Sequence, residues 1–189
     1  MPTTPIMPAN KAALRATKPT RQTLPTLPRQ PFCIVLDNLK CAHNVGTILR
    51  TAEALLAEHV YLTGTTLCPP HGKIRAASRG AEKWVPWSYV ADVTMALADL
   101  KTRGHYIVAC EITDNCVDYS TFTPPRWPVA LVMGREYDGV SPGALAMADA
   151  VVALPMYGMA NSLNVGVSAG VLLYHLNQLC QQTPTPAGR

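Results

Sequence analysis

Short apolar runs alternate with helical patterns along most of this chain, and this alternation limits the possible folds more than any other feature. Five runs have the length of a strand, at 32–36, 59–62, 106–110, 129–133 and 151–154. Segments with apolar residues at helical spacing lie at 43–56, 90–103, 142–148 and 163–179. Uninterrupted apolar strands with helices between them are typical of a parallel sheet covered on both faces. The sequence therefore predicts a mostly parallel α/β domain.

Polar residues stand at the junctions between these strands and helices. The stretch 156–165 joins the last strand to the last helix, and its Asn161 and Ser162 are good N-cap residues. Gly134 ends another strand and permits close approach by a ligand. Ligands of open α/β sheets bind at the carboxyl ends of strands. The candidate site residues at such junctions are Asn44, Arg50, Glu136, Ser162 and Asn164.

These residues alone indicate a small-molecule site beside an anion-binding arginine, and they do not specify a reaction. A purely structural interpretation stays open, because asparagine often caps helices and arginine often forms solvated ion pairs.

Several classes of site lack their sequence signatures. The five histidines are scattered without the spacing of metal ligands. Neither phosphate-loop glycine pattern occurs, nor does the Gly-x-Ser-x-Gly elbow of serine hydrolases. The six cysteines form no Cys-x-x-Cys pair, so reduced thiols in a cytoplasmic protein are expected. No apolar run reaches the roughly 18 residues of a membrane span. We therefore expect a soluble protein without metal or membrane.

The first 30 residues differ in composition from the rest. They contain six prolines and five cations without an acid, whereas residues 31–189 contain eleven cations and twelve carboxylates. We expect a disordered, basic, proline-rich tail at 1–30, a folded domain at 31–182 and a short tail at 183–189. The N-terminal tail is a solvated terminus, an arm that binds nucleic acid phosphates, or a mitochondrial presequence.

A second cationic segment lies inside the predicted domain. Four cations occur within eleven residues, and two tryptophans follow: Lys73, Arg75, Arg79, Lys83, Trp84 and Trp87. This pattern suits a phosphate-contacting patch with aromatic faces nearby. It equally suits a solvated surface segment over core tryptophans.

Three segments together resemble a known family. HNVGTILRTAEA at 43–54, LVMGREYDGVS at 131–141 and LPMYGMANSLNV at 154–165 are similar to the three motifs of the SpoU/TrmH branch of the SPOUT RNA methyltransferases. Each motif alone is weak, but their order and separation make the resemblance strong. It covers about residues 32–180, including the segments 79–84 and 114–115.

The resemblance implies an α/β domain with a C-terminal deep trefoil knot, a homodimer, and methyl transfer from S-adenosylmethionine to a ribose 2′-hydroxyl of RNA. It implies that a cofactor pocket is formed by Cys110, Met133, Gly134, Leu154, Met156, Ser162 and Leu163. The catalytic and RNA-orienting set would be Asn44, Arg50, Glu136, Ser162 and Asn164.

Some alternatives remain open at this point. Arg50 is proposed in this family to take the hydroxyl proton, but a guanidinium keeps its own proton at neutral pH, so Arg50 can instead clamp a phosphate. The expected target stays open between tRNA and rRNA, because family members that modify the tRNA D-loop carry helical extensions at both ends, where this sequence has a proline-rich arm and only residues 181–189 after Cys180. The alternative functions are an inactive RNA-binding or assembly protein of the same fold and a nucleotide-binding enzyme outside the family.

Overall fold

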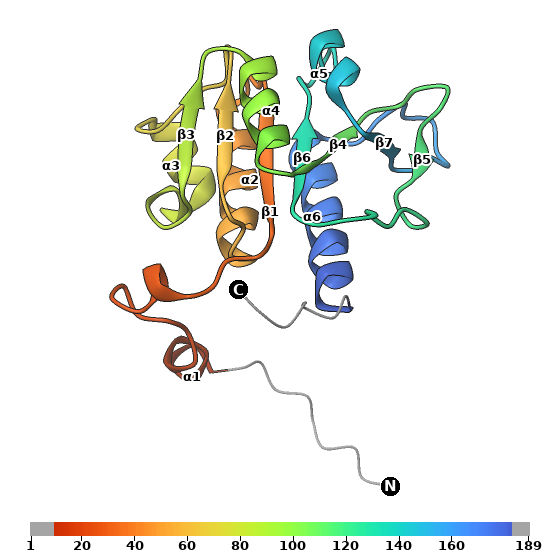
Figure 1. The fold of residues 1–189 in the computed structure, drawn as a ribbon. Coiled ribbons are helices and arrows are strands. Elements are labelled where there is room, and N and C mark those ends of the chain that lie inside the picture. Colours follow the sequence, from red (N-terminus) through yellow and green to blue (C-terminus); the bar gives the residue numbers. More distant parts are fainter. Residues whose placement is uncertain (1–9, 183–189) are drawn as a thin grey trace, which may run out of the picture.

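The computed structural model describes residues 10–182, and its centre is a parallel sheet of seven strands (Figure 1). The strand order across the sheet is β3-β2-β1-β6-β4-β7-β5, and every neighbouring pair is parallel. The strands are β1 Phe32–Asp37, β2 Val60–Thr63, β3 Trp87–Val90, β4 Tyr106–Cys110, β5 Val117–Asp118, β6 Val129–Met133 and β7 Ala150–Ala153.

Helices cover both faces of this sheet. On one face α2 (Ala42–Ala54) packs between α3 (Gly72–Ser78) and α6 (Val165–Gln182), and the 3-10 turn η2 (Ala81–Lys83) also contacts α2. On the other face α4 (Val93–Thr102) packs against α5 (Pro142–Met147). Within residues 10–182, no helix combines the length and the apolar character needed to cross a membrane.

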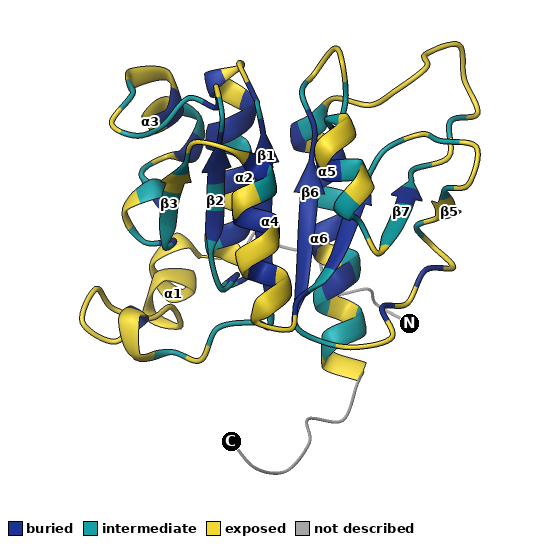
Figure 2. Cartoon of the chain, turned by 45° about the horizontal axis from the view of Figure 1, so that its top comes forward, coloured by how far each residue is buried: buried dark blue, intermediate teal, exposed yellow. Residues whose placement is uncertain are grey.

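The central strands supply two separate cores because their side chains alternate between the faces. In β1, Ile34 and Leu36 pack with α2 and α6, whereas Cys33 and Val35 pack with α4 and α5. In β6, Leu131 joins the first core and its two neighbours join the second. Figure 2 shows both strands buried along their length. This double burial explains why the central strands read as uninterrupted apolar runs.

All five predicted strands and all four predicted helices are confirmed, with bounds that shift by up to three residues. The strands β3 and β5 and the helix α3 were missed. β3 lies at one edge of the sheet and is only half-buried, and β5 at the other edge has two residues, so neither has a clear apolar run.

One predicted helix start was wrong. The last helix begins at Val165 and not at 163, and the side chain that accepts hydrogen bonds from its first N–H groups belongs to Asn164. Asn161 and Ser162 therefore do not cap α6. They lie in the loop before it and stay free for another role.

The N-terminal tail differs in part from the predicted disorder. Residues Lys11–Ala16 form α1 and Leu24–Thr26 form the 3-10 turn η1, whose Leu24 is buried. The tail then reaches the domain, where Gln30 forms a bridge to Ala57. The predictions for residues 1–9 and for the tail at 183–189 lie outside the described residues.

Gly46 brings α3 directly against α2. A Cβ atom added at Gly46 would lie 2.6 Å from the carbonyl oxygen of Ile74 and 2.7 Å from Cβ of Ala77, both in α3. Any side chain at position 46 would therefore push the two helices apart.

We expect Gly46→Ala to lower the free energy of unfolding by about 1–3 kcal/mol, because overpacking outweighs the higher helix propensity of alanine. Urea unfolding measures the change. Gly72→Ala at the start of α3 is the matched control, since nothing lies within 4 Å of a Cβ there. Equal stability of the two variants would contradict this account of the α2–α3 contact.

Candidate functional site

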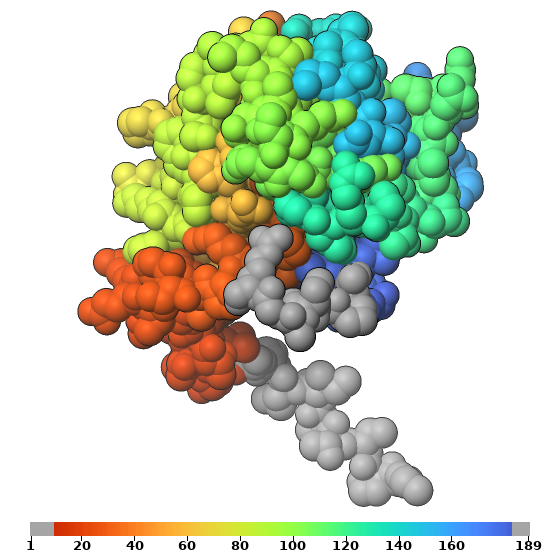
Figure 3. Space-filling model, viewed as in Figure 1, coloured from red at the N-terminus to blue at the C-terminus, as the bar shows by residue number. Residues whose placement is uncertain are grey.

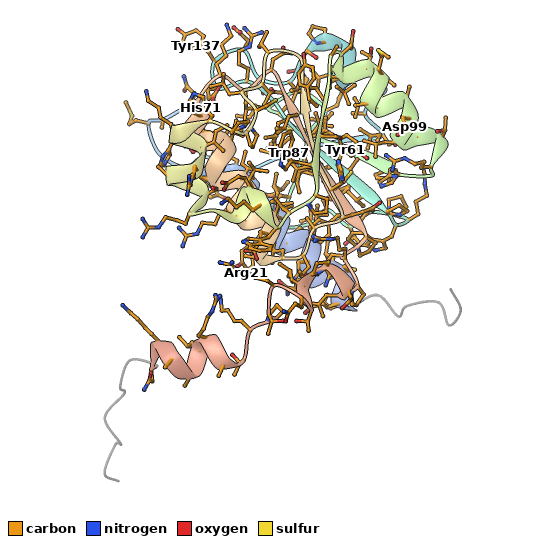
Figure 4. The ribbon with its side chains drawn as sticks, turned by 90° about the vertical axis from the view of Figure 1, so that its left-hand side faces the viewer. Arg21, Tyr61, His71, Trp87, Asp99 and Tyr137 are labelled. Atoms are coloured by element: carbon orange, nitrogen blue, oxygen red, sulfur yellow. The ribbon has the colours of Figure 1, made fainter. Side chains whose placement is uncertain are left out.

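A pocket of about 450 Å³ opens at the carboxyl edge of the sheet. The segments that follow β4, β6 and β7 meet there with the start of α6, as expected for parallel strands. Tyr137, labelled at the top of the molecule in Figure 4, marks this edge. The lining consists of Cys110, Glu111, Ile112, 133–139, Ala153, Leu154, Met156, 162–165 and Ser168.

The loop after β6 forms one wall of the pocket and depends on a glycine. A Cβ atom at Gly134 would lie 2.1 Å from the backbone of Gly139 and Val140, so only glycine fits. The loop closes through two backbone hydrogen bonds between Arg135 and Gly139, at 2.9 and 3.0 Å. It is thereby held in a tight turn over the pocket.

Glu111 holds this loop from the side of β4. Its Oε2 accepts a hydrogen bond from the Val140 N–H at 2.7 Å, and its Oε1 accepts one from the Ile112 N–H at 2.9 Å. The sequence reasoning missed Glu111, although its signal was available. An acid directly after the predicted strand 106–110 must lie at the same edge as Glu136.

Three polar side chains from distant segments form a continuous hydrogen-bonded chain beside the pocket. Asn44 donates through Nδ2 to Oε1 of Glu136 at 2.9 Å and accepts at Oδ1 from Nδ2 of Asn164 at 3.0 Å. Asn164 Oδ1 in turn accepts from the Gly166 N–H at 2.9 Å. Asn44 is only 4% exposed, so its amide must be satisfied by these partners.

The carboxylate of Glu136 is held in its charged form. Burial raises its pKa, but hydrogen bonds from Asn44 and from the backbone N–H groups, including those of Cys41 and Lys40, together lower it below the ordinary value. At neutral pH Glu136 is therefore an ionised acceptor and a weak base. This favours a positioning role over proton transfer.

The structure brings all seven predicted cofactor residues to the wall of this one pocket. The apolar side chains of Leu154, Met156 and Leu163 suit the flat face of a heterocycle. Burial, and next the Glu111 carboxylate, raise the pKa of the Cys110 thiol to about 12, so this group stays a neutral thiol. Cys110 is therefore a wall residue and not a nucleophile.

The predicted catalytic residues are only partly brought together. Glu136, Ser162 and Asn164 line the pocket and Asn44 bonds to two of them, but Arg50 does not line it. Arg50 is exposed on α2, whereas Asn44 is buried. At about 100° per residue, positions six apart are separated by about 120° around the helix axis, so the two side chains lie on different sides of α2. Within residues 10–182, no group of three potential metal ligands is found.

Comparisons with known proteins agree with this geometry. Residues 31–174 match the model of the SpoU rRNA Methylase family. The tRNA (guanosine(18)-2'-O)-methyltransferase of Escherichia coli is 34% identical over 150 residues, which are 77% of this chain and 63% of that protein. The enzyme of the same name from Aquifex aeolicus is 36% identical over 148 residues, or 77% and 69%. The chain thus spans less than two thirds of the length of the Escherichia coli relative.

Solved structures show the same fold. The A. aeolicus TrmH/SpoU tRNA modifying enzyme has a TM-score of 0.73 at 31% identity, over 82% of this chain and 77% of that one. An AdoMet bound rRNA methyltransferase from Sinorhizobium meliloti has a TM-score of 0.74 at 29% identity, over 82% and 59%. The chain therefore has the SPOUT knot fold, as the sequence predicts. This fold is an exception to the rule that protein chains are unknotted. The chain belongs to the SpoU methylase family.

We expect Asn44→Asp to destabilise the protein in a pH-dependent way. The new carboxylate faces Glu136, and repulsion raises the pKa of one of the two groups above its unfolded value. Such a group destabilises the fold when it is ionised, so the loss is largest above pH 7 and shrinks as the pH falls through the raised pKa.

Urea unfolding at pH 7.5 and pH 5 measures this difference, with an expected loss of about 1–2 kcal/mol at the higher pH. Asn115→Asp, in an exposed loop, is the matched control and should change little. An equal loss for Asn44→Asp at both pH values would show that repulsion of Glu136 is not its cause.

Proposed function

We propose that this chain transfers a methyl group from S-adenosylmethionine to a ribose 2′-hydroxyl of RNA. The observation that carries the proposal is that residues of all three motifs lie together at one site. The pocket is lined by the second and third motifs, and Asn44 of the first is hydrogen-bonded to Glu136 of the second and Asn164 of the third.

The residues of the pocket fit S-adenosylmethionine. Leu154, Met156 and Leu163 provide apolar walls for an adenine, and a volume of about 450 Å³ lies in the usual range for small-molecule sites. The ionised Glu136 lines the same pocket and would provide negative charge for the cationic sulfonium. Two related structures support the choice, since the S. meliloti rRNA methyltransferase and the SpoU methyltransferase AviRb of Streptomyces viridochromogenes each have AdoMet bound.

The chain of Asn44, Glu136 and Asn164 would orient the ribose. S-adenosylmethionine supplies a methyl group that is already strongly electrophilic, so the protein must mainly align the ribose oxygen and let its proton leave. Because a guanidinium keeps its proton, Arg50 would clamp a neighbouring phosphate with two hydrogen bonds. The hydroxyl proton then passes to a phosphate oxygen or to water as the new oxygen–carbon bond forms and the sulfur–carbon bond breaks.

A homodimer would explain the position of Arg50. The outward side of α6 is apolar and exposed at Val167 (52%) and Tyr174 (58%), with Gly170 between them. A second copy on this side would cover that surface next to α2, which packs along α6. We propose that Arg50 of one copy completes the pocket of the other.

The substrate is tRNA or rRNA, as in the names of the relatives, and the cytoplasm is the proposed location. Mapping ribose methylation in RNA from cells with and without the gene identifies the nucleotide. Failure of the chain to bind S-adenosylmethionine would favour the alternative of an inactive RNA-binding protein.

We expect Arg50→Ala to lower methyl transfer by on the order of 100-fold or more while S-adenosylmethionine still binds, because the clamp contacts RNA and not the cofactor. Tritium transfer to RNA and titration calorimetry measure the two properties. Arg126→Ala removes an arginine that stacks on Tyr106 away from the pocket and should keep both. A fully active Arg50→Ala protein would refute the assigned role.

Heterodimers distinguish the two possible sources of the arginine. The side chain of Gly134→Val would clash with the backbone of Gly139 and Val140. It would displace the loop that forms one wall of the pocket, and should therefore abolish cofactor binding. A purified heterodimer of one Arg50→Ala chain and one Gly134→Val chain should recover about half of the wild-type activity, since one of its two sites is complete. An inactive heterodimer would place Arg50 with its own pocket, and a monomer in sedimentation would exclude the dimer.

A further inference from the structure

A row of four cations along the sequence lies on the exposed surface of α3 and η2. Lys73, Arg75, Arg79 and Lys83 are all exposed. Among residues 10–182, none of the four has a carboxylate partner within 4.0 Å. The one acid of this segment, Glu82, accepts a hydrogen bond from the Ser78 hydroxyl. The positive charge of the row is therefore not compensated by the fold.

Charge is strongly segregated in the chain as a whole. Residues 1–30 and 71–84 together contain nine cations and one carboxylate, whereas the remaining residues contain seven cations and eleven carboxylates. A surface segment that only needs solubility mixes both signs. The concentration of one sign on two segments indicates an anionic partner.

The two basic segments meet at Trp84. The guanidinium of Arg21 lies 5.7 Å from the centre of a Trp84 ring, and Nη2 of Arg29 donates to the Trp84 carbonyl at 3.1 Å. Nη1 of Arg29 also donates to the carbonyl of Ala57 at 3.1 Å. In Figure 3 the red to orange tail lies against the yellow-green surface above it. The tail thus extends the row of cations beyond η2.

The row leads toward the pocket edge. α3 follows β2 and begins beyond the carboxyl end of the sheet, and Figure 4 shows His71 at its upper end and Arg21 below its lower end. α3 also packs directly on α2, which carries Asn44 and the exposed Arg50. A polymer bound along the row would therefore continue toward the site.

We propose that Arg21, Lys73, Arg75, Arg79 and Lys83 form a basic track that binds the sugar–phosphate backbone of the substrate RNA beside the methylated nucleotide. The proposal rests on the proposed function for the identity of the anion. The track consists of flexible, exposed cations on a short surface helix and the turn after it, which suits phosphates better than a folded acidic protein. Phosphate contacts position an RNA without reading its sequence.

The track variant is Lys73→Gln/Arg75→Gln/Lys83→Gln. Glutamine keeps helix propensity, and Arg79 is left unchanged because its φ of 56° would add a backbone effect to any substitution. The control for net charge, Lys101→Gln/Arg103→Gln/Arg126→Gln, removes three charges from elsewhere on the domain; its melting temperature should fall, because Lys101 pairs with Asp149 and Arg103 with Asp99. Both proteins are compared with wild type in melting temperature and S-adenosylmethionine affinity, which should be unchanged in the track variant.

RNA binding is measured by fluorescence anisotropy with a labelled pool of unmodified tRNA transcripts and, in parallel, with unmodified rRNA fragments, between 50 and 200 mM salt. We expect Kd at about 100 mM salt to rise at least tenfold in the track variant, and the slope of log affinity against log salt to fall by about 2 to 3. In methyl-transfer assays KM for RNA should rise while kcat stays. The control should resemble wild type in Kd, salt slope, KM and kcat.

An unchanged Kd and salt slope with both RNA pools would overturn the proposal and leave the row as a solvated surface. An equal loss in the control would do the same, because it would reflect net charge alone. These outcomes are separate from failure of the proposed function. A wild-type protein that binds RNA through the track but neither binds S-adenosylmethionine nor methylates RNA refutes the enzyme and keeps the track.

Discussion

The amide of Asn44 joins three segments that are distant in the sequence, and the architecture of the site depends on this interaction. Its hydrogen-bond partners lie 92 and 120 residues away, in the loop after β6 and at the start of α6. Both polar atoms of a buried amide need partners, so the segments cannot separate without exposing an unsatisfied group. The same amide helps to lower the pKa of Glu136 and connects Glu136 to Asn164, which caps α6.

The two signs of charge are divided between two parts of the molecule. The pocket edge carries the carboxylates of Glu111 and Glu136, each held by backbone N–H groups, while a group of cations without ion pairs among residues 10–182 lies on α3 and η2. A cationic cofactor and an anionic polymer would thus meet opposite fields. Arg50 is exposed on α2, which packs between α3 and α6. Within one chain, Arg50 belongs neither to the pocket nor to the cations of α3 and η2.

Much of the fold and of the pocket could be predicted from the residues. The strand at 129–133 was read correctly to the residue, because a strand covered on both faces must be apolar throughout. β3 and α3 were missed because edge strands and short surface helices have no such pattern. The helix α1 lies in a segment whose composition favours disorder, and its start is capped by Asn10, a local signal that composition hides.

The sequence by itself determined the sheet, the helices between its strands and the three motifs, because periodicity and local chemistry are properties of neighbouring residues. It could not determine that Asn164 rather than Ser162 caps α6, that Glu111 supports the loop over the pocket, or that Arg50 does not line that pocket. Those outcomes depend on which side of a helix or strand meets a distant segment, and only the packed tertiary structure decides that.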